Sequence, residues 1–269
     1  MGNNNKFMRD VQREKDSRNI QIDRVGVKGV SYPVILMDKD NQTQNTIANV
    51  SMSVMLPHEY RGTHMSRFIE TLEEYRGRVS PANLDAFTTR LCEKLNASES
   101  SVIFEFPYYF KKKAPVSKIE SFSKCDVRLE AIHERRKESE NFDMIIGLAL
   151  NIQTLCPCSK EISQFGAHNQ RALVSLNVRC SGLVWFEELI NMIESSASAP
   201  LFTLLKREDE KYITELSYMR PRFVEDVLRE LATSLDNENR ILWYSVNVTS
   251  YESIHNHDAF AEIERDKRK

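Results

Sequence analysis

The sequence has no apolar run that approaches the roughly 18 residues a membrane span needs, so we expect no membrane partner. It also lacks a charge excess of one sign, because 37 basic residues face 39 acidic ones. That balance disfavours general binding to nucleic acid, and any phosphate ligand would have to be held by a local cluster of cations. The N-terminal MGNNNKFMRDVQREKD has no apolar core, which argues against a secretory signal peptide, and we expect residues 1–19 to form a disordered tail.

Cysteine is scarce, and its five copies follow no framework spacing. This pattern excludes a secreted disulfide-bonded scaffold and favours a reducing, cytoplasmic location. The chain also lacks the pair of C-x-x-C knuckles from which closed structural zinc sites are often built. With 269 residues, it is long enough for one large or two ordinary domains that bury a real core.

The densest group of reactive side chains lies in the segment QTLCPCSKEISQFGAHNQR, in the middle of the chain. Cys156 and Cys158 are separated by one residue where an apolar run ends, and His168 lies twelve positions after Cys156. A single cysteine or histidine is more often structural, so the clustering is what favours a site. Thiolate and imidazole are ligands that borderline divalent metals prefer, and the incomplete Cys/His set suggests an open, catalytic coordination sphere completed by a carboxylate. Lys160 and Arg171 bracket the segment and suit an anion.

Two periodicities alternate along the chain in a repeated order. Period-2 patterns predict strands at 20–37, 50–56, 102–110, 126–134, 142–155, 172–180, 241–250 and 259–263. Apolar residues three to four apart predict helices at 68–75, 80–95, 185–194 and 221–235. The order strand, strand, helix, helix, strand, strand occurs twice, which predicts an α+β fold of two similar units packed side by side. We place these units at 20–137 and 138–269.

Seven runs of the sequence resemble the prokaryotic GTP cyclohydrolases of type IB. They are GVKGVSYPV from Gly26, LPHEYRGTHMSRF from Leu56, TLCPCSKEIS from Thr154, GAHNQRA from Gly166, LLKREDEKYITE from Leu204, RPRFVEDVLR from Arg220 and YESIHNHDAF from Tyr251. The resemblance covers about residues 21–260. It implies a tunnelling fold (T-fold), in which a tandem pair of ββααββ units has antiparallel sheets, and a homotetramer with active sites between subunits. It also implies hydrolysis of GTP at guanine C8 to 7,8-dihydroneopterin triphosphate and formate, the first step of tetrahydrofolate and pterin biosynthesis.

The same resemblance implies roles for individual residues. Cys156, His168 and Glu210 match the ligands of a divalent metal, which the donor set allows to be zinc, manganese or iron. Cys158 matches a second thiol beside the metal, so that Cys156, Cys158 and His168 form the expected catalytic group. Glu225 matches the carboxylate that anchors guanine, whose N1–H and exocyclic amine are adjacent donors that one carboxylate can accept together.

Two further sets of polar residues complete the expected substrate site. The residues available to the triphosphate are His64, Arg67, Lys160 and Arg171. Glu252, His255 and His257 crowd into six positions after a predicted strand, a density that burial alone does not require.

Two other functions compete with this interpretation. A nitrile reductase of queuosine biosynthesis would share the fold, but its Glu-Ser-Lys-Ser type run is missing from the sequence. A non-enzymatic Cys-Pro-Cys metal or redox module is the other alternative. Redox pairs usually have the spacing C-x-x-C, and this alternative gives Glu210 and Glu225 no role.

Overall fold

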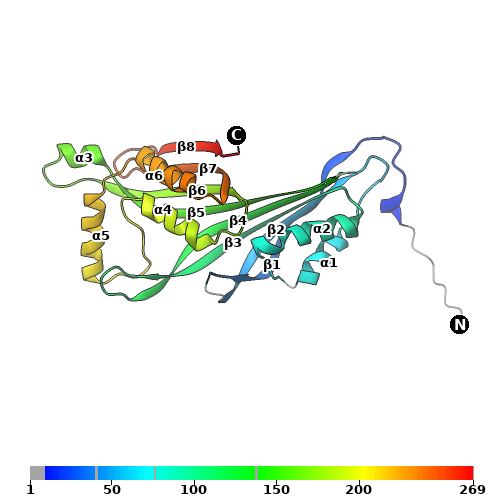
Figure 1. Ribbon diagram of the computed structural model, residues 1–269, viewed down its shortest axis with the longest axis horizontal. Coiled ribbons are helices and arrows are strands. Elements are labelled where there is room, and N and C mark those ends of the chain that lie inside the picture. Colours follow the sequence, from blue (N-terminus) through cyan, green and yellow to red (C-terminus); the bar gives the residue numbers. More distant parts are fainter. Residues whose placement is uncertain (1–9, 40–41, 76, 137–138, 269) are drawn as a thin grey trace.

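A computed structural model describes residues 10–39, 42–75, 77–136 and 139–268 of the chain. Within these residues, eight strands form one antiparallel sheet whose spatial order follows the chain (Figure 1). The strands are β1 (Ile22–Met37), β2 (Thr43–Leu56), β3 (Glu99–Lys113), β4 (Glu120–Arg136), β5 (Ser139–Leu155), β6 (Asn169–Cys180), β7 (Ile241–Ser250) and β8 (Ala259–Asp266). The α-helices are α1 (Ser66–Tyr75), α2 (Leu84–Leu95), α3 (Pro157–Ile162), α4 (Phe186–Ser196), α5 (Arg207–Met219) and α6 (Val224–Asn237). The predicted α+β class with antiparallel strands is confirmed.

All eight predicted strands occur, while the helices differ from the prediction at four places. Pro81 opens a short 3-10 turn, Pro81–Asn83, before α2 begins at Leu84. The predicted helix from 221 starts instead at Val224, because Phe223 is an extended N-cap residue with ψ 166°. Helices α3 and α5 were not predicted.

One face of the sheet carries the core. Strand residues alternate between the two faces, so matching positions on neighbouring strands form a row across the sheet. The register aligns one fully buried residue from each of six consecutive strands: Val50, Phe104, Leu129, Ile146, Val178 and Tyr244. Burying a large apolar side chain stabilises a fold by about 1.5–3 kcal/mol, so this row and its neighbours anchor the architecture.

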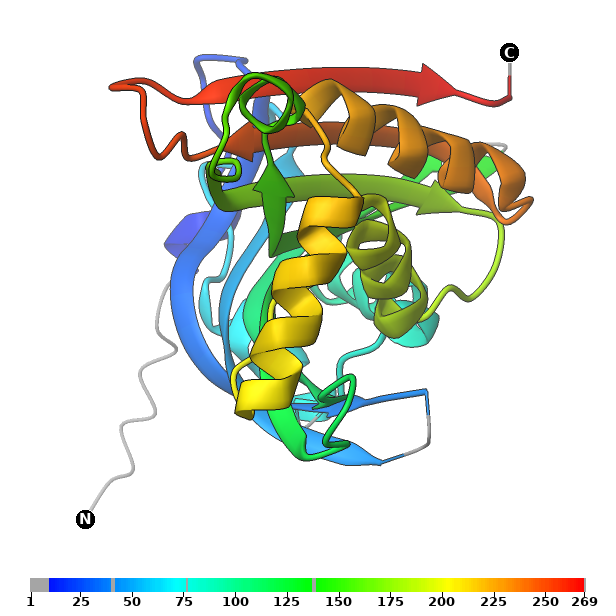
Figure 2. The same ribbon diagram turned by 90° about the vertical axis from the view of Figure 1, so that its left-hand side faces the viewer.

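Helices cover that apolar face. α1 and α2 form the connection from β2 to β3, and α4, α5 and α6 form the connection from β6 to β7. Figure 2 shows the sheet curving around them. The next row of residues, on the opposite face, is largely polar and pairs Glu105 with Arg128, Gly147 with Asn177, and Ser245 with Glu264. The sheet therefore has one face packed against helices and one polar face.

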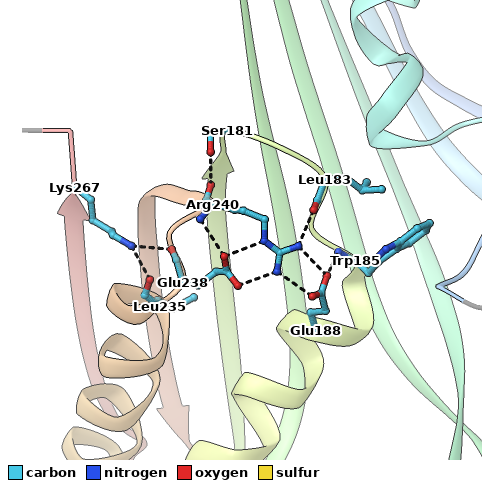
Figure 3. A network of polar contacts seen from close by, with 8 residues as sticks. All are labelled: Ser181, Leu183, Trp185, Glu188, Leu235, Glu238, Arg240 and Lys267. Atoms are coloured by element: carbon cyan, nitrogen blue, oxygen red, sulfur yellow. Dashed lines mark hydrogen bonds and ion pairs between the residues drawn. The ribbon is translucent and has the colours of Figure 1, made fainter.

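A polar network fixes the turn between α6 and β7 (Figure 3). The guanidinium of Arg240 donates to Glu188 over 2.9 Å, to Glu238 over 2.8 Å and to the carbonyl of Leu183 over 2.9 Å. The hydrogen bonds that Glu238 accepts from the side chain and the backbone N–H of Arg240 lower its pKa to about 2. Lys267 donates to the carbonyls of Glu238 and Leu235, so α4, α6 and β8 meet at this turn.

The sheet is continuous through the predicted junction of the two units. β4 and β5 pair from Asp126 opposite Ala149 to Arg136 opposite Ser139, while residues 137–138 lie outside the described part. Of the expected N-terminal tail, residues 1–9 also lie outside it. Residues 10–19 are described, and the carbonyl of Glu14 accepts a hydrogen bond from the N–H of Arg61 over 3.0 Å. Across the described ranges, none of the helices has the length and apolar content that crossing a membrane requires.

Candidate active site

The segment after β5 forms a short helix and then returns beside its own start. Cys156 takes the extended N-cap position of α3, and Pro157 opens the helix. The N–H of Ser159 donates to the Sγ of Cys156 over 3.4 Å, and the N–H of His168 donates to the Oγ of Ser159 over 3.1 Å. The N–H of Cys156 in turn donates to the carbonyl of His168 over 3.1 Å. This closed loop brings two of the expected metal ligands onto paired neighbouring segments.

A chain of polar contacts extends from the imidazole of His168. Its Nδ1 lies 2.9 Å from the Oε1 of Gln170. The Nε2 of Gln170 lies 3.2 Å from the Oγ1 of Thr154 and 3.4 Å from the Oε1 of Glu252. Glu252 also accepts a 2.8 Å hydrogen bond from Ser250, the last residue of β7. The expected substrate residue Glu252 thus contacts His168 through Gln170.

The last turn of α5 and the connection to α6 pack against the same loop. Lys160 donates to the carbonyl of Tyr218 over 2.7 Å, and its Nζ lies 4.4 Å from the centre of the Tyr218 ring. The N–H of Arg222 donates to the carbonyl of Leu155, the last residue of β5, over 2.9 Å. Glu225 follows in the first turn of α6 and is exposed. The expected guanine anchor is therefore carried to the end of the molecule that holds Cys156.

The turn between β7 and β8 adds the two expected histidines. The Oγ of Ser253 lies 3.5 Å from the Nδ1 of His168, which places this turn beside the α3 loop. His255 and His257 are exposed, with ring centres 5.2 Å apart and ring planes 25° apart. Cys158 is exposed on α3.

Nine of the expected residues thus lie at one end of the molecule, the left-hand end in Figure 1, where α3 projects. They are Cys156, Cys158, Lys160, His168, Arg171, Glu225, Glu252, His255 and His257. Arg171 exposes its side chain from β6, and its carbonyl accepts a 2.9 Å hydrogen bond from the N–H of Tyr251.

Glu210 is the expected ligand that the fold keeps apart. It is exposed in the first turn of α5, whereas the contact with Lys160 is made by Tyr218 near the other end of that helix. The rise of an α-helix puts about 12 Å between residues 210 and 218 along the axis. One chain therefore does not bring Glu210 to Cys156 and His168.

Asp209, the neighbour of Glu210, fixes the start of α5. Its buried carboxylate accepts from the N–H groups of Val116 and Ser117 over 2.8 and 2.9 Å, and from the Ser117 hydroxyl over 2.6 Å. It also accepts from the N–H of Lys206 over 2.9 Å. Burial alone would raise the pKa of Asp209, but these hydrogen bonds outweigh it and hold the pKa well below its ordinary value. The β3–β4 turn thereby sets the position from which Glu210 projects.

Arg67 lies in α1 and His64 lies two residues before its start, so both are far from this end, since α1 lies toward the right in Figure 1. They line a cavity of about 490 Å³ together with Tyr60 and Lys94. The Nε2 of His64 lies 3.3 Å from a carboxylate oxygen of Asp10, and Arg67 donates to the carbonyl of Lys94 over 2.7 Å. A single chain therefore does not join them to the loop of Cys156.

The donor set within one chain fits a metal only in part. Among the residues that the structure describes, no three His, Cys, Asp or Glu side chains gather in a metal-binding arrangement. Cys156 and His168 nevertheless supply a sulfur and a nitrogen donor on paired segments, a combination that suits a borderline divalent ion. Cys156 and His168 therefore fit two positions of a metal centre and leave its carboxylate ligand to be supplied from elsewhere.

Two polar residues important to this region were not among the predicted site residues. Gln170 lies two positions after His168, and residues i and i+2 of an extended segment share a face, so this spacing was a usable signal. Asp209 gave no comparable signal, because its partners Val116 and Ser117 lie more than ninety positions earlier in the chain.

Comparisons with known proteins agree along nearly the whole chain. The profile of a family described as "Type I GTP cyclohydrolase folE2" matches residues 8–261. A protein of Kosmotoga olearia named GTP cyclohydrolase FolE2 is 52% identical over 260 residues, which cover 97% of this chain and 99% of that protein. A protein of the same name from Thermosipho africanus is 50% identical, covering 96% and 98%. One from Geotalea uraniireducens is 48% identical, covering 97% and 94%.

Solved structures with a similar fold have little sequence in common with this chain. Uricase from Arthrobacter globiformis matches with a TM-score of 0.55 at 8% identity, covering 91% of this chain and 93% of that one. Urate oxidase from Bacillus subtilis 168 also gives a TM-score of 0.55, at 10% identity, covering 91% and 99%. At this identity the likeness concerns the fold, which these enzymes share with the present chain.

Proposed function

The chain belongs to the family of type I GTP cyclohydrolases named FolE2, and from that premise we propose that it hydrolyses GTP to 7,8-dihydroneopterin triphosphate and formate. This reaction is an entry step of tetrahydrofolate and pterin biosynthesis. The structural observation that supports it is the pairing of Cys156 with His168 at the base of the α3 loop, within the matched region. The family match favours this activity over the nitrile reductase and the redox module.

Cys156, His168 and Glu210 would hold a divalent metal, either zinc, manganese or iron. When bound, the metal would lower the pKa of water enough to supply a nucleophile for guanine C8 near neutral pH. Cys158, exposed on the same helix turn, would hand a proton to the purine ring nitrogen as the ring opens. His255 and His257 would accept and return protons while C8 leaves as formate.

Glu225 would select the base. From the first turn of α6 its carboxylate accepts the N1–H and the exocyclic amine of guanine together. Adenine has an unprotonated N1 and would leave one carboxylate oxygen facing a lone pair. Sites built to bond a substrate N–H reject analogues that lack it.

The complete site would form between copies of the chain. Glu210, His64 and Arg67 lie away from Cys156 within one chain, so a second copy would supply them, with His64 and Arg67 joining Lys160 and Arg171 around the triphosphate. Pairing or covering the edge strands β1 and β8 would also favour assembly. We propose a homotetramer, in which each chain carries T-fold units at 20–137 and 138–269. Its five cysteines are free, which supports a cytoplasmic location.

The test is to incubate the purified protein with GTP and to measure formate release together with pterin fluorescence. The wild-type chain is expected to produce both in equal amounts, with ATP giving neither. Cys156→Ala should abolish both products, while Cys180→Ala, at the far end of β6, should preserve them. Formate release that persists at the wild-type rate in Cys156→Ala would contradict the proposed site.

A further inference from the structure

We propose that Gln170 is a positioning residue that holds His168 as the Nδ1–H tautomer and thereby leaves Nε2 as the nitrogen that binds the metal. This inference rests on the proposed function, because it concerns how that metal centre is prepared.

The orientation of the Gln170 amide follows from Glu252. A carboxylate only accepts hydrogen bonds, and the Oε1 of Glu252 lies 3.4 Å from the Nε2 of Gln170. That amide position must therefore be the donating NH2 group. The Oγ1 of Thr154, 3.2 Å from the same nitrogen, is a second acceptor for it. The carbonyl oxygen of Gln170 is consequently turned toward His168.

The tautomer of His168 follows from that orientation. The Oε1 of Gln170 is an acceptor and lies 2.9 Å from the Nδ1 of His168, so Nδ1 carries the hydrogen. In a neutral imidazole the other nitrogen, Nε2, then has a free lone pair. The Ser253 hydroxyl also lies near the Nδ1 of His168, but it does not have to donate a hydrogen to that nitrogen. It lies 3.4 Å from the Oε1 of Gln170 and can donate to that oxygen instead.

The fold holds this chain of contacts in place from two strands. Gln170 lies in β6, and the carbonyl of Arg171 pairs with the N–H of Tyr251 just beyond β7. Glu252 follows directly, and the hydroxyl of Ser250 donates to it over 2.8 Å. The order Ser250, Glu252, Gln170, His168 is therefore set by strand pairing before any metal binds. Outer partners of this kind fix the orientation of a ligating histidine and raise its basicity.

Three variants separate this role from simple packing. Gln170→Met keeps the length of the side chain and removes both its acceptor and its donor. The exchange Gln170→Glu/Glu252→Gln keeps an acceptor toward Nδ1 and a donor–acceptor pair between positions 170 and 252, so it serves as the conservative rescue. Asn169→Ala is the matched control, since the neighbouring Asn169 is exposed and its amide oxygen accepts from Gln153 rather than from His168.

The direct measurement is the 15N spectrum of the imidazoles in the full-length, metal-free protein at about pH 8. The His168 signals, identified by their loss in His168→Gln, should show a protonated Nδ1 and an unprotonated Nε2. Gln170→Met should shift His168 toward the Nε2–H form, while the exchange Gln170→Glu/Glu252→Gln and Asn169→Ala should keep the wild-type pattern. Metal titration should show about 10- to 100-fold weaker binding for Gln170→Met, against little change for the exchange Gln170→Glu/Glu252→Gln and for Asn169→Ala.

Two results would overturn the proposal: a wild-type His168 in the Nε2–H form, or a Gln170→Met chain with the wild-type tautomer and metal affinity. A different result would show that the proposed function is wrong. If the wild-type chain shows the Nδ1–H tautomer but binds no metal, the role of Gln170 in setting the tautomer stands and the metal centre does not.

Discussion

The two halves of the sheet share an order of strands but differ in what lies between them. β1 and β2 are joined by a short turn after Met37, whereas β5 and β6 are joined through α3 and the loop back to His168. The connection from β2 to β3 contains two α-helices, and the connection from β6 to β7 contains three. The second half thus has two extra helices, and these carry Cys158, Lys160 and Glu210. The shared elements build the core, and the additions supply much of the candidate site.

Two histidines show the same contrast at the level of single residues. His133, on β4 in the first half, is 3% exposed, and its Nδ1 lies 3.3 Å from both the carboxylate of Asp85 and the hydroxyl of Thr89. His168 is only half-buried, and its Nδ1 contacts Gln170 at the mouth of the α3 loop. One imidazole is part of the core, while the other is left accessible to a ligand.

The largest expected effect sharpens this contrast. His168→Ala should lower metal affinity and turnover more than the roughly 10- to 100-fold that is typical when a residue hydrogen-bonded to a metal ligand is removed. Its melting temperature should be nearly unchanged. His133→Ala should instead lower the unfolding free energy by about 1–3 kcal/mol and keep the metal content. Elemental analysis, formate release and denaturant unfolding of both variants provide the comparison. Full metal content in His168→Ala would contradict the assignment of His168 as a metal ligand.

The elements shared by the halves were predictable because each buries a regular apolar face. α6 buries Val227, Leu231 and Leu235 on one side, and that period is visible in the sequence. α5 was missed because its buried positions are Asp209, Ile213 and Ser217, so its inward face is largely polar. α3 was missed because it spans only six residues, too few to show a period.

The candidate site was predictable where it is local in the sequence. Cys156 and His168 belong to one loop, and their clustering indicated a site that the fold then brings together. The separation of Glu210 from them could not be predicted, because it depends on the docking of Asp209 against a turn more than ninety residues earlier. The role of Gln170 depends on Glu252, which is 82 positions away.

The second-largest expected effect concerns the contact between the two halves of the sheet. Lys112 on β3 pairs with Glu194 on α4, donates to the carbonyl of Leu201 over 2.7 Å and lies over the Phe202 ring. Burial lowers the pKa of Lys112 and raises that of Glu194, so each charge needs its partner. Lys112→Met should lower the unfolding free energy by about 3–5 kcal/mol, because Glu194 is left buried and unpaired.

The double variant Lys112→Met/Glu194→Leu is the control, and it should recover most of that loss. Denaturant unfolding of the single and double variants measures both effects. A single variant that is no less stable than the double one would show that the contact does not join the halves.

A smaller effect tests the base anchor at the end of the second half. Glu225→Gln puts an NH2 donor against a guanine donor, so GTP binding should weaken by about 1–3 kcal/mol while metal content is unchanged. Glu230→Gln, exposed on the same helix, should bind GTP as the wild type does. Calorimetry on the metal-loaded proteins measures both affinities. Equal affinities would remove Glu225 from the substrate site.

The smallest effect is a difference in thiol reactivity. Burial raises the pKa of Cys125, on β4, to about 12, so at pH 8 its thiol is almost entirely protonated. Cys158 is exposed on α3. An alkylating reagent followed by mass spectrometry should label Cys158 first and Cys125 last, and raising the pH toward 10 should speed the labelling of Cys125. Early labelling of Cys125 would contradict its buried state.

The most direct test of a site shared between copies is to mix two inactive chains. Cys156→Ala and Glu210→Ala are each expected to be inactive alone. When the two variants are refolded together in equal amounts, half of the chain pairs that share sites contain one chain of each kind. Each such hybrid pair has two sites, and in one of them both Cys156 and Glu210 are intact. About a quarter of the wild-type formate release should therefore return. If Cys156 and Glu210 of the same chain formed the site, no hybrid would hold an intact site, and the mixture would stay inactive.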